Sequence, residues 1–382
     1  MNWNNLLDKW EAYIRDIGPA NDDYERLIRH YNGFNIVYEF KESVLKNLAS
    51  SILVSFFLKK MKKNIIELDD KYDCVITASD KAYLLNDESL PNELNKKYAK
   101  KIRICNEGNS LLKHWNEFCL DDSAVQIINE AYKRFPKQKM MILSLLLHLG
   151  RTCMIVHKYN PDAIIVTQAE QDYTSTMITK YCESNGIDYI CVQHGEYCYN
   201  PSMAFMRFTK YYAWDKETIE ILEMTNNKID FAQIYTPTRL LKTYERKSEP
   251  DYFITYYLSD EKADVLQKIQ LTMDRFAESG YKCCIRWHPR AFDEETILKY
   301  FGQSKATIEN PYKVSLGDSI ANTKYVVGYR TTVLSEVLAS HLDPVIDDVT
   351  QDVGLLIRMK DQNYTRIKLR LSSLIQKYIE GK

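Results

Sequence analysis

The sequence predicts an α/β protein made of two Rossmann-like domains. Short apolar runs, typical of buried strands, alternate with helical segments along most of the chain, which is the pattern of parallel sheets. At 382 residues the chain is long enough for two such domains. The stretch from Tyr235 to Pro250 contains Pro237 and a charged run, and is the best candidate for a linker. We therefore expect domains at residues 1–240 and 250–362, followed over 363–382 by a C-terminal helix that crosses back onto the first domain.

The first domain is expected to begin with helices over residues 1–69, because apolar residues recur there at helical spacing. Past them, alternating apolar and amphipathic patterns predict strands at 74–78, 102–105, 163–167, 187–192 and 208–213. A helical region is predicted at 124–157 and a helix at 174–185. The apolar run Met140–Leu147 is too short to span a bilayer, so it is interpreted as part of a core helix.

The second domain repeats the alternation. Strands are predicted at 252–258, 283–287, around Tyr325 and at 343–346, and the intervening segments predict helices that end at Glu278 and start at Thr332. Gly280 follows the first of these helices, as expected of a residue that closes a helix. An amphipathic pattern over residues 366–379 predicts the last helix.

Charge and cysteine content exclude some classes of function. The formal net charge is −1, so the chain has no global basic field, which argues against nucleic acid as a main partner. Nine cysteines are present without a C-x-x-C pair, which argues against a zinc site. Their odd number and the lack of a recognisable signal peptide favour the reducing cytoplasm.

Polar residues follow the predicted strand at Cys283–Trp287. Pro289 cannot donate to a sheet ladder and holds His288 in an extended conformation, so the strand ends there. His288 and two arginines, Arg286 and Arg290, then lie near the carboxyl edge of the strand, where open α/β sheets bind their ligands.

A second polar cluster follows about one strand–helix–strand unit later. The strand at Tyr325 ends in Gly328, and Arg330, Thr331 and Thr332 lead into a helix. Free N–H groups and hydroxyls at a helix N-terminus bind anions. With Ser259 at the end of the first strand of the same domain, these groups suit a nucleotide phosphate.

In the first domain, Gln193-His194-Gly195-Glu196 follows a buried strand. A right-handed crossover between parallel strands would bring this segment to the same sheet edge as Glu170 and Asp172. His194 is a candidate general base, since an imidazole accepts a proton near neutral pH. Each motif also has a purely structural reading. His288-Pro289 would only end a strand, and Thr331-Thr332 would only cap a helix. His194 would be a turn residue whose hydrogen bonds are made within the protein.

These motifs resemble those of the bacterial surface-polysaccharide glycosyltransferases of the GT-B type, over roughly residues 160–345. The relevant branch includes sialyltransferases and polysialyltransferases, Kdo transferases and teichoic-acid glycerophosphotransferases. Those families carry a His-Pro motif and a later Ser/Thr pair that contact the donor nucleotide, and an acidic or His-Gly motif that carries the base. His288-Pro289, Thr331-Thr332 and His194-Gly195 match them here, although the sialyltransferase-type acidic-acidic-Gly motif is absent.

The resemblance implies a GT-B fold, in which two Rossmann-like domains face each other across a cleft. It implies transfer from a nucleotide-activated sugar, such as a CMP- or UDP-sugar, to a growing surface polysaccharide or a lipid-linked oligosaccharide. Glu336 would hold the nucleotide ribose, and His194 would be the base. Glu196, Glu170 or Asp172 would orient that base or bind the acceptor.

No D-x-D motif is present that would hold a metal ion on a diphosphate. His288, Arg330 and the helix N-terminus at Thr331-Thr332 would replace the ion electrostatically. We therefore expect an inverting reaction that needs neither metal nor cofactor. Three alternatives stay open at this stage, which are a polyol-phosphate transferase of the CDP-glycerol type, a non-hydrolysing sugar-nucleotide epimerase and a non-catalytic scaffold.

Two lysine-rich segments flank apolar helices in the first domain. They are Lys59–Lys63 and Lys133–Lys139. Lysines in a last helical turn complement the helix dipole, which is the structural reading. The functional reading is peripheral contact with an anionic membrane at the inner face of the cell membrane, where a lipid-linked acceptor would be presented.

Overall fold

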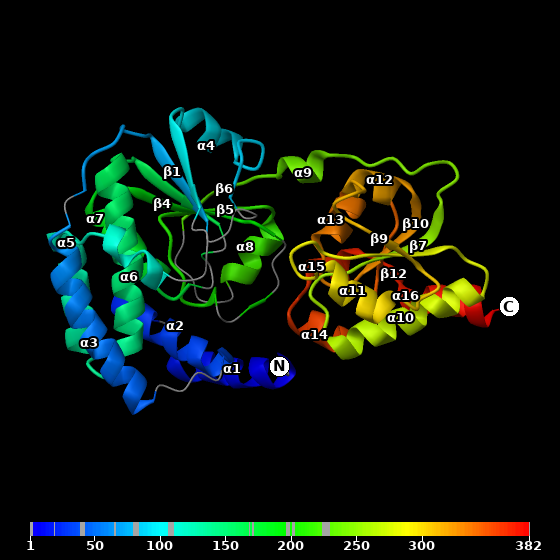
Figure 1. Cartoon of the computed structure of the whole chain (residues 1–382), viewed down its shortest axis with the longest axis horizontal. Coiled ribbons are helices and arrows are strands. Elements are labelled where there is room, and N and C mark those ends of the chain that lie inside the picture. Colours follow the sequence, from blue (N-terminus) through cyan, green and yellow to red (C-terminus); the bar gives the residue numbers. More distant parts are fainter. Residues whose placement is uncertain are drawn as a thin grey trace. The chain divides into compact units, whose positions relative to one another are not determined.

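The chain forms two compact units. The first runs from Met1 to His194 and from Tyr199 to Pro237, and the second comprises the remaining residues, chiefly Thr238–Lys382. Figure 1 shows the chain coloured along its sequence. The computed structural model describes residues 3–18, 20–38, 43–64, 66–78, 84–105, 111–167, 169, 172–195, 199–200, 203–223 and 230–381.

The first unit contains a parallel sheet of six strands in the order β2-β1-β3-β4-β5-β6. The first five strands lie where the sequence predicts them, whereas β6 was not predicted. Side chains on one face of the sheet pack on Leu90, Leu94 and Tyr98, which belong to α4 and its flanking residues. The strands are β1 (Cys74–Ala78), β2 (Lys101–Cys105), β3 (Ala163–Val166), β4 (Asp188–Val192), β5 (Lys210–Ala213) and β6 (Phe231–Ile234).

Helices form the rest of the first unit, and the helical N-terminus predicted from the sequence is confirmed. The helical region predicted over 124–157 consists of two helices, because Pro136 lacks the N–H that a continuous helix requires. Short 3-10 turns span Leu111–Lys113 and Trp115–Glu117. The helices are α1 (Trp3–Ile17), α2 (Asp23–Tyr38), α3 (Val44–Met61), α4 (Asn92–Lys97), α5 (Asp122–Arg134), α6 (Lys139–Tyr159), α7 (Ser175–Ser184) and α8 (Lys216–Glu223).

The longest of these helices, α6, is a core helix, as predicted. By length and composition alone its 21 residues could cross a membrane, but more than half of its most apolar stretch is buried inside the unit. It packs against α3, α5 and α7, and Figure 1 shows α3 running alongside it. Asn160 ends the helix in a left-handed conformation, with φ 42°.

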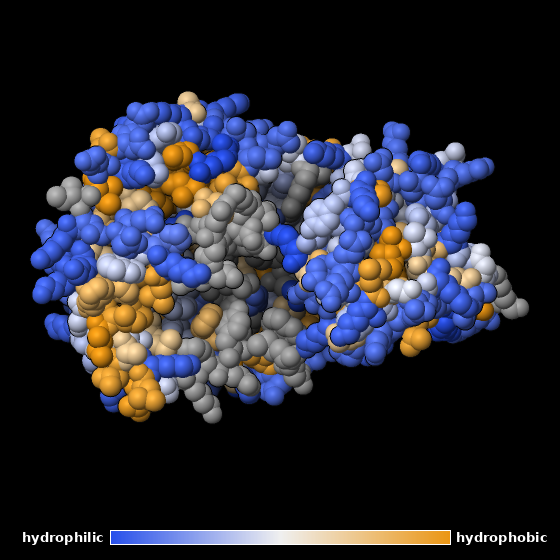
Figure 2. Space-filling model, viewed as in Figure 1, coloured by the Kyte–Doolittle hydropathy of each residue, from blue (hydrophilic) through white to orange (hydrophobic). Residues whose placement is uncertain are grey.

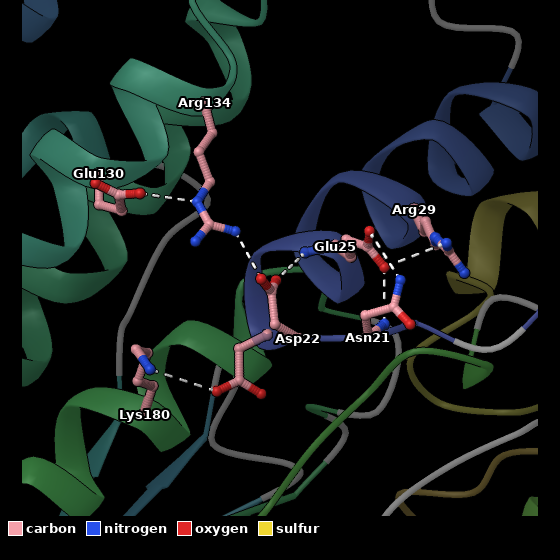
Figure 3. Close-up of polar contacts among 8 residues, drawn as sticks. Asn21, Asp22, Glu25, Arg29, Glu130, Arg134 and Lys180 are labelled. Atoms are coloured by element: carbon pink, nitrogen blue, oxygen red, sulfur yellow. Dashed lines mark hydrogen bonds and ion pairs between the residues drawn. The ribbon is translucent and has the colours of Figure 1, made fainter.

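Ion pairs attach the start of α2 to α5 and α7 (Figure 3). The Asp22 carboxylate lies 2.6 Å from Nη1 of Arg134, whose Nε donates to Glu130 one helical turn earlier at 2.8 Å. On the other side, Lys180 of α7 lies 3.7 Å from Asp23. Each exposed pair contributes at most about 1 kcal/mol. Together these ion pairs help to hold the start of α2 against α5 and α7.

The second unit contains another parallel sheet of six strands, in the order β12-β11-β10-β7-β8-β9. Counted from the first strand of this unit, the order is the 3-2-1-4-5-6 arrangement of a Rossmann fold. The short edge strands β9 and β12 were not predicted from the sequence. The strands are β7 (Tyr252–Tyr257), β8 (Cys283–Arg286), β9 (Thr307–Glu309), β10 (Thr323–Gly328), β11 (Pro344–Ile346) and β12 (Leu369–Arg370).

Helices cover both faces of this sheet. Side chains of α10, α11 and α16 pack on one face, and those of α12, α13 and α14 pack on the other. Five of the helices begin with a side chain that accepts a backbone N–H as an N-cap, namely Asp293, Ser315, Thr331, Asp352 and Asp361. The helices are α9 (Thr238–Leu241), α10 (Ala263–Glu278), α11 (Glu294–Phe301), α12 (Leu316–Ala321), α13 (Thr332–Ala339), α14 (Val353–Arg358), α15 (Gln362–Arg366) and α16 (Leu371–Ile375).

The C-terminal segment corrects one prediction. It was expected to form a single helix that crosses back onto the first unit. Instead β12 joins the sheet of the second unit, and Leu371, Leu374 and Ile375 are buried in that unit's core. The chain then continues through a π-helical turn at Gln376–Glu380. Burial of these apolar residues beside α10 explains why the segment stays with the second unit.

The predicted α/β class is confirmed, since the chain contains two parallel six-stranded sheets in two Rossmann-like units. Two such units are what the predicted GT-B fold requires. The facing arrangement of the units across a cleft stays a prediction.

Candidate functional site

The strand order of the second unit reverses between β7 and β10, and ligands of open α/β sheets bind outside the carboxyl ends of the strands at such a point. Tyr256 of β7 lies beside Val327 of β10, and Tyr257 lies beside Arg286 of β8. The three strands therefore end level with one another. The segments that follow them contain the residues predicted to bind the donor, which the structure brings to one edge of the sheet.

His288 lies two residues past the end of β8 and is half-buried. Its Nδ1 accepts the backbone N–H of Arg290 at 3.2 Å, which leaves the proton of the neutral ring on Nε2. Burial lowers the pKa of His288, and the nearby Arg290 lowers it further. At neutral pH the ring is therefore a neutral hydrogen-bond donor. The carbonyl of Pro289 accepts a hydrogen bond from the Tyr312 hydroxyl at 2.9 Å, which fixes the turn after the ring.

Arg286, one of the three arginines predicted to bind the donor, has a buried partner. Its Nη1 lies 2.6 Å from the Glu309 carboxylate of β9, and only 8% of each side chain is exposed. Breaking a buried pair leaves one charge without a partner, which costs several kcal/mol. The pair therefore joins β8 to the edge strand β9, and a direct contact of Arg286 with a donor stays a prediction.

The segments after β7 and β10 are in close contact through Ser259, Gly328 and Thr331. The Ser259 hydroxyl donates to the backbone carbonyl of Arg330 at 2.9 Å. Gly328 leaves no room for a side chain, because a Cβ there would lie 2.6 Å from Cγ2 of Thr331 and 3.4 Å from the Tyr257 carbonyl oxygen. The Thr331 hydroxyl accepts the N–H of Val333 and so caps α13. Thr332 is the first residue of that helix, and anion binding at its N-terminus stays a prediction.

Glu336, predicted to hold the nucleotide ribose, lies on α13 and is buried. One of its carboxylate oxygens accepts a hydrogen bond from the Tyr244 hydroxyl at 2.8 Å. Burial raises the pKa of Tyr244, and the neighbouring carboxylate raises it further, so the phenol keeps its proton and stays a donor. The ribose contact stays a prediction.

An acidic cluster that sequence reasoning missed lies just past β7 and β11. Glu261 accepts the N–H of Ser259 at 2.8 Å. Asp347, which is fully buried, accepts the Tyr256 hydroxyl and the N–H groups of Val349 and Thr350. Burial, with smaller contributions from the charges of Asp260 and Asp347, raises the pKa of Glu261 to about 7 against the opposing hydrogen bond from Ser259. The position of Glu261 directly after a predicted strand was the only sequence signal available.

In the first unit, β4 leads directly to His194, which is half-buried. The preceding residue, Gln193, is buried and fixed on several sides. Its side-chain oxygen accepts the backbone N–H of Trp214 at 2.6 Å, and its backbone carbonyl accepts the Trp214 indole N–H and the Tyr235 hydroxyl, each at 3.0 Å. These bonds join the ends of β4, β5 and β6, so the backbone that presents His194 is anchored.

Asp172 has described partners other than His194. One of its oxygens accepts the backbone N–H and the hydroxyl of Thr174, each at 2.8 Å, and the other lies 3.2 Å from Nδ1 of His148 on α6. His148 was not predicted to belong to this site. Glu170 and Glu196, the remaining predicted acids, lie outside the described residues.

A cavity of about 800 Å³ lies in the first unit beside the edge strand β2 and α6. Arg151 of α6 contributes to its lining and donates to the Thr77 hydroxyl of β1 at 2.5 Å. Burial lowers the pKa of Arg151, and no carboxylate of the described residues pairs with it. His114, Glu117 and Lys158 also line the cavity, which is therefore polar and carries charges of both signs.

Within the described residues, one group of side chains has the composition of a metal site. Asp121, Cys153 and His157 have ligand atoms within 4.8 Å of one another. The Asp121 carboxylate already accepts the N–H of Ala124 as the cap of α5, and the hydroxyl of Tyr181. These bonds explain the cluster as part of the packing of α5, α6 and α7.

Comparisons with known proteins find similarity among solved structures. No family model matches the chain, and no curated protein matches it. The chain is similar to the lipopolysaccharide outer core galactosyltransferase WaaB, with 9% identity over 82% of this chain and 95% of that one and a TM-score of 0.39. It is similar to the UDP-GlcNAc 2-epimerase of Methanocaldococcus jannaschii, with 12% identity over 72% of this chain and 83% of that one and a TM-score of 0.42. It is also similar to a GtfA/B complex, with 13% identity over 57% of this chain and a TM-score of 0.33. The match covers 50% of that chain's own length.

The raised pKa of Glu261 makes stability depend on pH. A glutamate with an ordinary pKa of 4.5 in the unfolded chain and about 7 in the folded one stabilises the fold fully below pH about 4.5. This contribution is lost as pH rises through about 7. Glu261→Gln keeps an acceptor for Ser259 without a charge. We expect the variant to exceed the wild type in unfolding free energy by about 2–3 kcal/mol at pH 8, with the difference vanishing toward pH 4.5.

Urea unfolding of both proteins across this pH range is the measurement. Glu295→Gln, on α11, is the matched control because Glu295 is exposed. A Glu261→Gln variant whose stability follows the wild type in parallel at every pH would show that Glu261 titrates as an ordinary glutamate.

Proposed function

We propose that this protein is a glycosyltransferase that moves a sugar from a nucleotide-activated donor to a growing surface polysaccharide or a lipid-linked oligosaccharide. The observation that carries the proposal is the reversal of strand order between β7 and β10 in the second unit. At that edge His288, Arg330 and the capped N-terminus of α13 offer hydrogen-bond donors and positive charge to a nucleotide phosphate. A CMP- or UDP-sugar is the donor class that we favour.

The chemistry assigns one role to each unit. In the first unit, His194 takes the proton of the acceptor hydroxyl, whose oxygen attacks the anomeric carbon of the donor sugar. The bond from that carbon to the phosphate oxygen breaks, and the nucleotide leaves with the electron pair. In the second unit, His288 and the start of α13 stabilise the charge that develops on the leaving phosphate. A single displacement of this kind inverts the anomeric configuration.

Peripheral contact with the inner face of the cell membrane is part of the same proposal, because a lipid-linked acceptor is presented there. Incubation with donor alone separates this function from its alternatives. An epimerase changes the sugar without any acceptor, a transferase releases the nucleotide only slowly, and a scaffold leaves the donor unchanged. A polyol-phosphate transferase is distinguished by offering CDP-glycerol beside CMP- and UDP-sugars.

The first prediction of this proposal concerns His288. We expect His288→Ala to lower turnover by about 10²-fold and to weaken nucleotide binding, because one preorganised donor is lost. His288→Gln, which keeps an N–H donor, should recover part of the loss.

The thermal shift of each protein with CMP, CDP, UDP and GDP measures binding, since a ligand of the native state raises the melting temperature. His114→Ala, at an exposed histidine of the first unit, is the control. Unchanged nucleotide affinity and turnover in His288→Ala would make His288 a strand terminator only.

The second prediction is that turnover survives chelation. The chain has no D-x-D motif, and the donors at the β7 and β10 edge would act on the phosphate in place of a divalent ion. Turnover is measured with EDTA and then with added Mg²⁺ or Mn²⁺. Activity that EDTA abolishes and either ion restores would contradict the metal-independent reaction.

The third prediction concerns the base. We expect His194→Ala to lower kcat by about 10²- to 10⁴-fold and to remove the acid limb of the pH profile, while donor affinity stays as in the wild type. The profile of kcat against pH is compared with that of Glu196→Gln. If His194→Ala keeps most of its kcat while Glu196→Gln abolishes turnover, the carboxylate is the base instead.

A further inference from the structure

Helix α3 has two apolar faces, of which only one is covered. Its buried residues are Ser50, Val54, Phe57 and Met61, and this side packs against α6. The opposite side is also apolar, so the helix is hydrophobic nearly all round. Helices of that kind are normally buried in a protein core or in a membrane.

Exposed apolar residues follow the uncovered side of α3 turn by turn. Leu45, Leu48, Ile52 and Phe56 recur at spacings of three and four residues and are 78%, 60%, 63% and 43% exposed. We call these four residues the α3 face. Figure 2 shows hydrophobic atoms gathered where Figure 1 places α3. Exposed leucines of the second unit, such as Leu271, lie in amphipathic helices and are ordinary surface residues.

Aromatic residues continue the α3 face at its C-terminal end. The ring of Trp115 lies edge-on to Phe56 with centroids 5.3 Å apart, and it also contacts Phe57 at 5.1 Å. Leu112, which precedes this tryptophan by one short turn, is 43% exposed. Tryptophan prefers the boundary between the polar and apolar parts of a bilayer, so its position at the rim of an apolar surface suits a membrane interface.

Lysines surround the α3 face and no acid interrupts it. The sequence from Ser43 to Ile66 contains five lysines and neither Asp nor Glu. Four of them, at the end of α3 and just past it, pair with no carboxylate among the described residues, and they are Lys59, Lys60, Lys62 and Lys63. The face therefore combines apolar area with uncompensated positive charge.

The second lysine-rich segment belongs to the same surface. The Tyr132 hydroxyl of α5 interacts with Ser51 on α3, and Nζ of Lys139 lies 3.4 Å from the centre of the Tyr132 ring. The neighbouring Lys133 and Lys137 are exposed. Both lysine-rich segments of the sequence thus flank one side of α3, although they are separated along the chain.

We propose that the α3 face docks on an anionic lipid bilayer, with its leucine, isoleucine and phenylalanine side chains entering the acyl boundary and the lysines contacting lipid phosphates. This rests on the membrane contact of the proposed function, for which it specifies the surface, and it uses residues of the first unit alone. Charge complementarity selects the membrane over a second copy of the chain, because two α3 faces brought together would oppose their unpaired lysines. Apolar side chains that enter the acyl boundary and lysines that attract anionic lipids both strengthen peripheral binding to a membrane.

Co-sedimentation of the full-length protein with vesicles tests the proposal. We compare vesicles of phosphatidylcholine alone with vesicles that also contain phosphatidylglycerol, at low and high salt. The protein should pellet with the anionic vesicles and be partly released by salt. Replacing Lys59, Lys60, Lys62 and Lys63 by Gln should weaken binding to anionic vesicles on the order of 10²- to 10³-fold. The double variant Leu48→Asp and Ile52→Asp should abolish binding at either salt concentration.

Leu271→Asp, an exposed leucine of α10, is the matched control and should bind as the wild type does. The substituted lysine, leucine and isoleucine side chains are exposed and Trp115 is half-buried, so an unchanged melting temperature verifies folding of each variant. A blue shift of tryptophan fluorescence on anionic vesicles, lost in Trp115→Phe, is a second readout. Equal pelleting with neutral and anionic vesicles, or pelleting unaffected by the Leu48 and Ile52 changes, would overturn the proposal. So would a dimer in light scattering that these changes convert to a monomer without any vesicle binding.

Discussion

Parallel strands buried on both faces are the constraint on which the rest of the structure depends. Helices cover both sides of the second sheet, so the last three residues of β7, β8 and β10 are buried and leave no place for an exposed polar group. Polar residues gather where these strands end, and the reversal of strand order opens the sheet edge at that point. His288 and Ser259 are therefore neighbours through topology, although they come from separate segments of the chain.

Burial affects which side chains at this edge carry a charge, as residue type does. Arg286 is turned toward Glu309 and contributes its charge to the sheet, whereas His288 is kept neutral and acts as a hydrogen-bond donor. Glu261 lies near the same edge with Asp260 and Asp347, and three ionised carboxylates would repel a phosphate. The raised pKa of Glu261 reduces that repulsion at neutral pH. The edge proposed to bind an anion can thus include acidic residues with less repulsion of that anion.

Patterns along the chain predicted most elements, because the strands buried on both faces are short continuous apolar runs such as β1 and β4. The two-residue β12 and the three-residue β9 are too short to leave such a pattern. Partners were harder to predict than positions. The pairing of Arg286 with Glu309 depends on which strand lies at the sheet edge, and the covering of Glu336 by Tyr244 depends on the path of a linker. The segment over 366–379 was wrongly expected to leave its unit, since an amphipathic pattern does not say which core its apolar side will join.

The lysines around the α3 face have a consequence for the protein in free solution. An apolar stripe over several turns of a helix favours self-association, and like charges beside it oppose the approach of another copy. Solubility should therefore fall as added salt screens these charges. Salt has the opposite effect on proteins whose copies associate through surface ion pairs, because it weakens that association. The same few residues would keep the chain dispersed in water and concentrate it on an anionic surface.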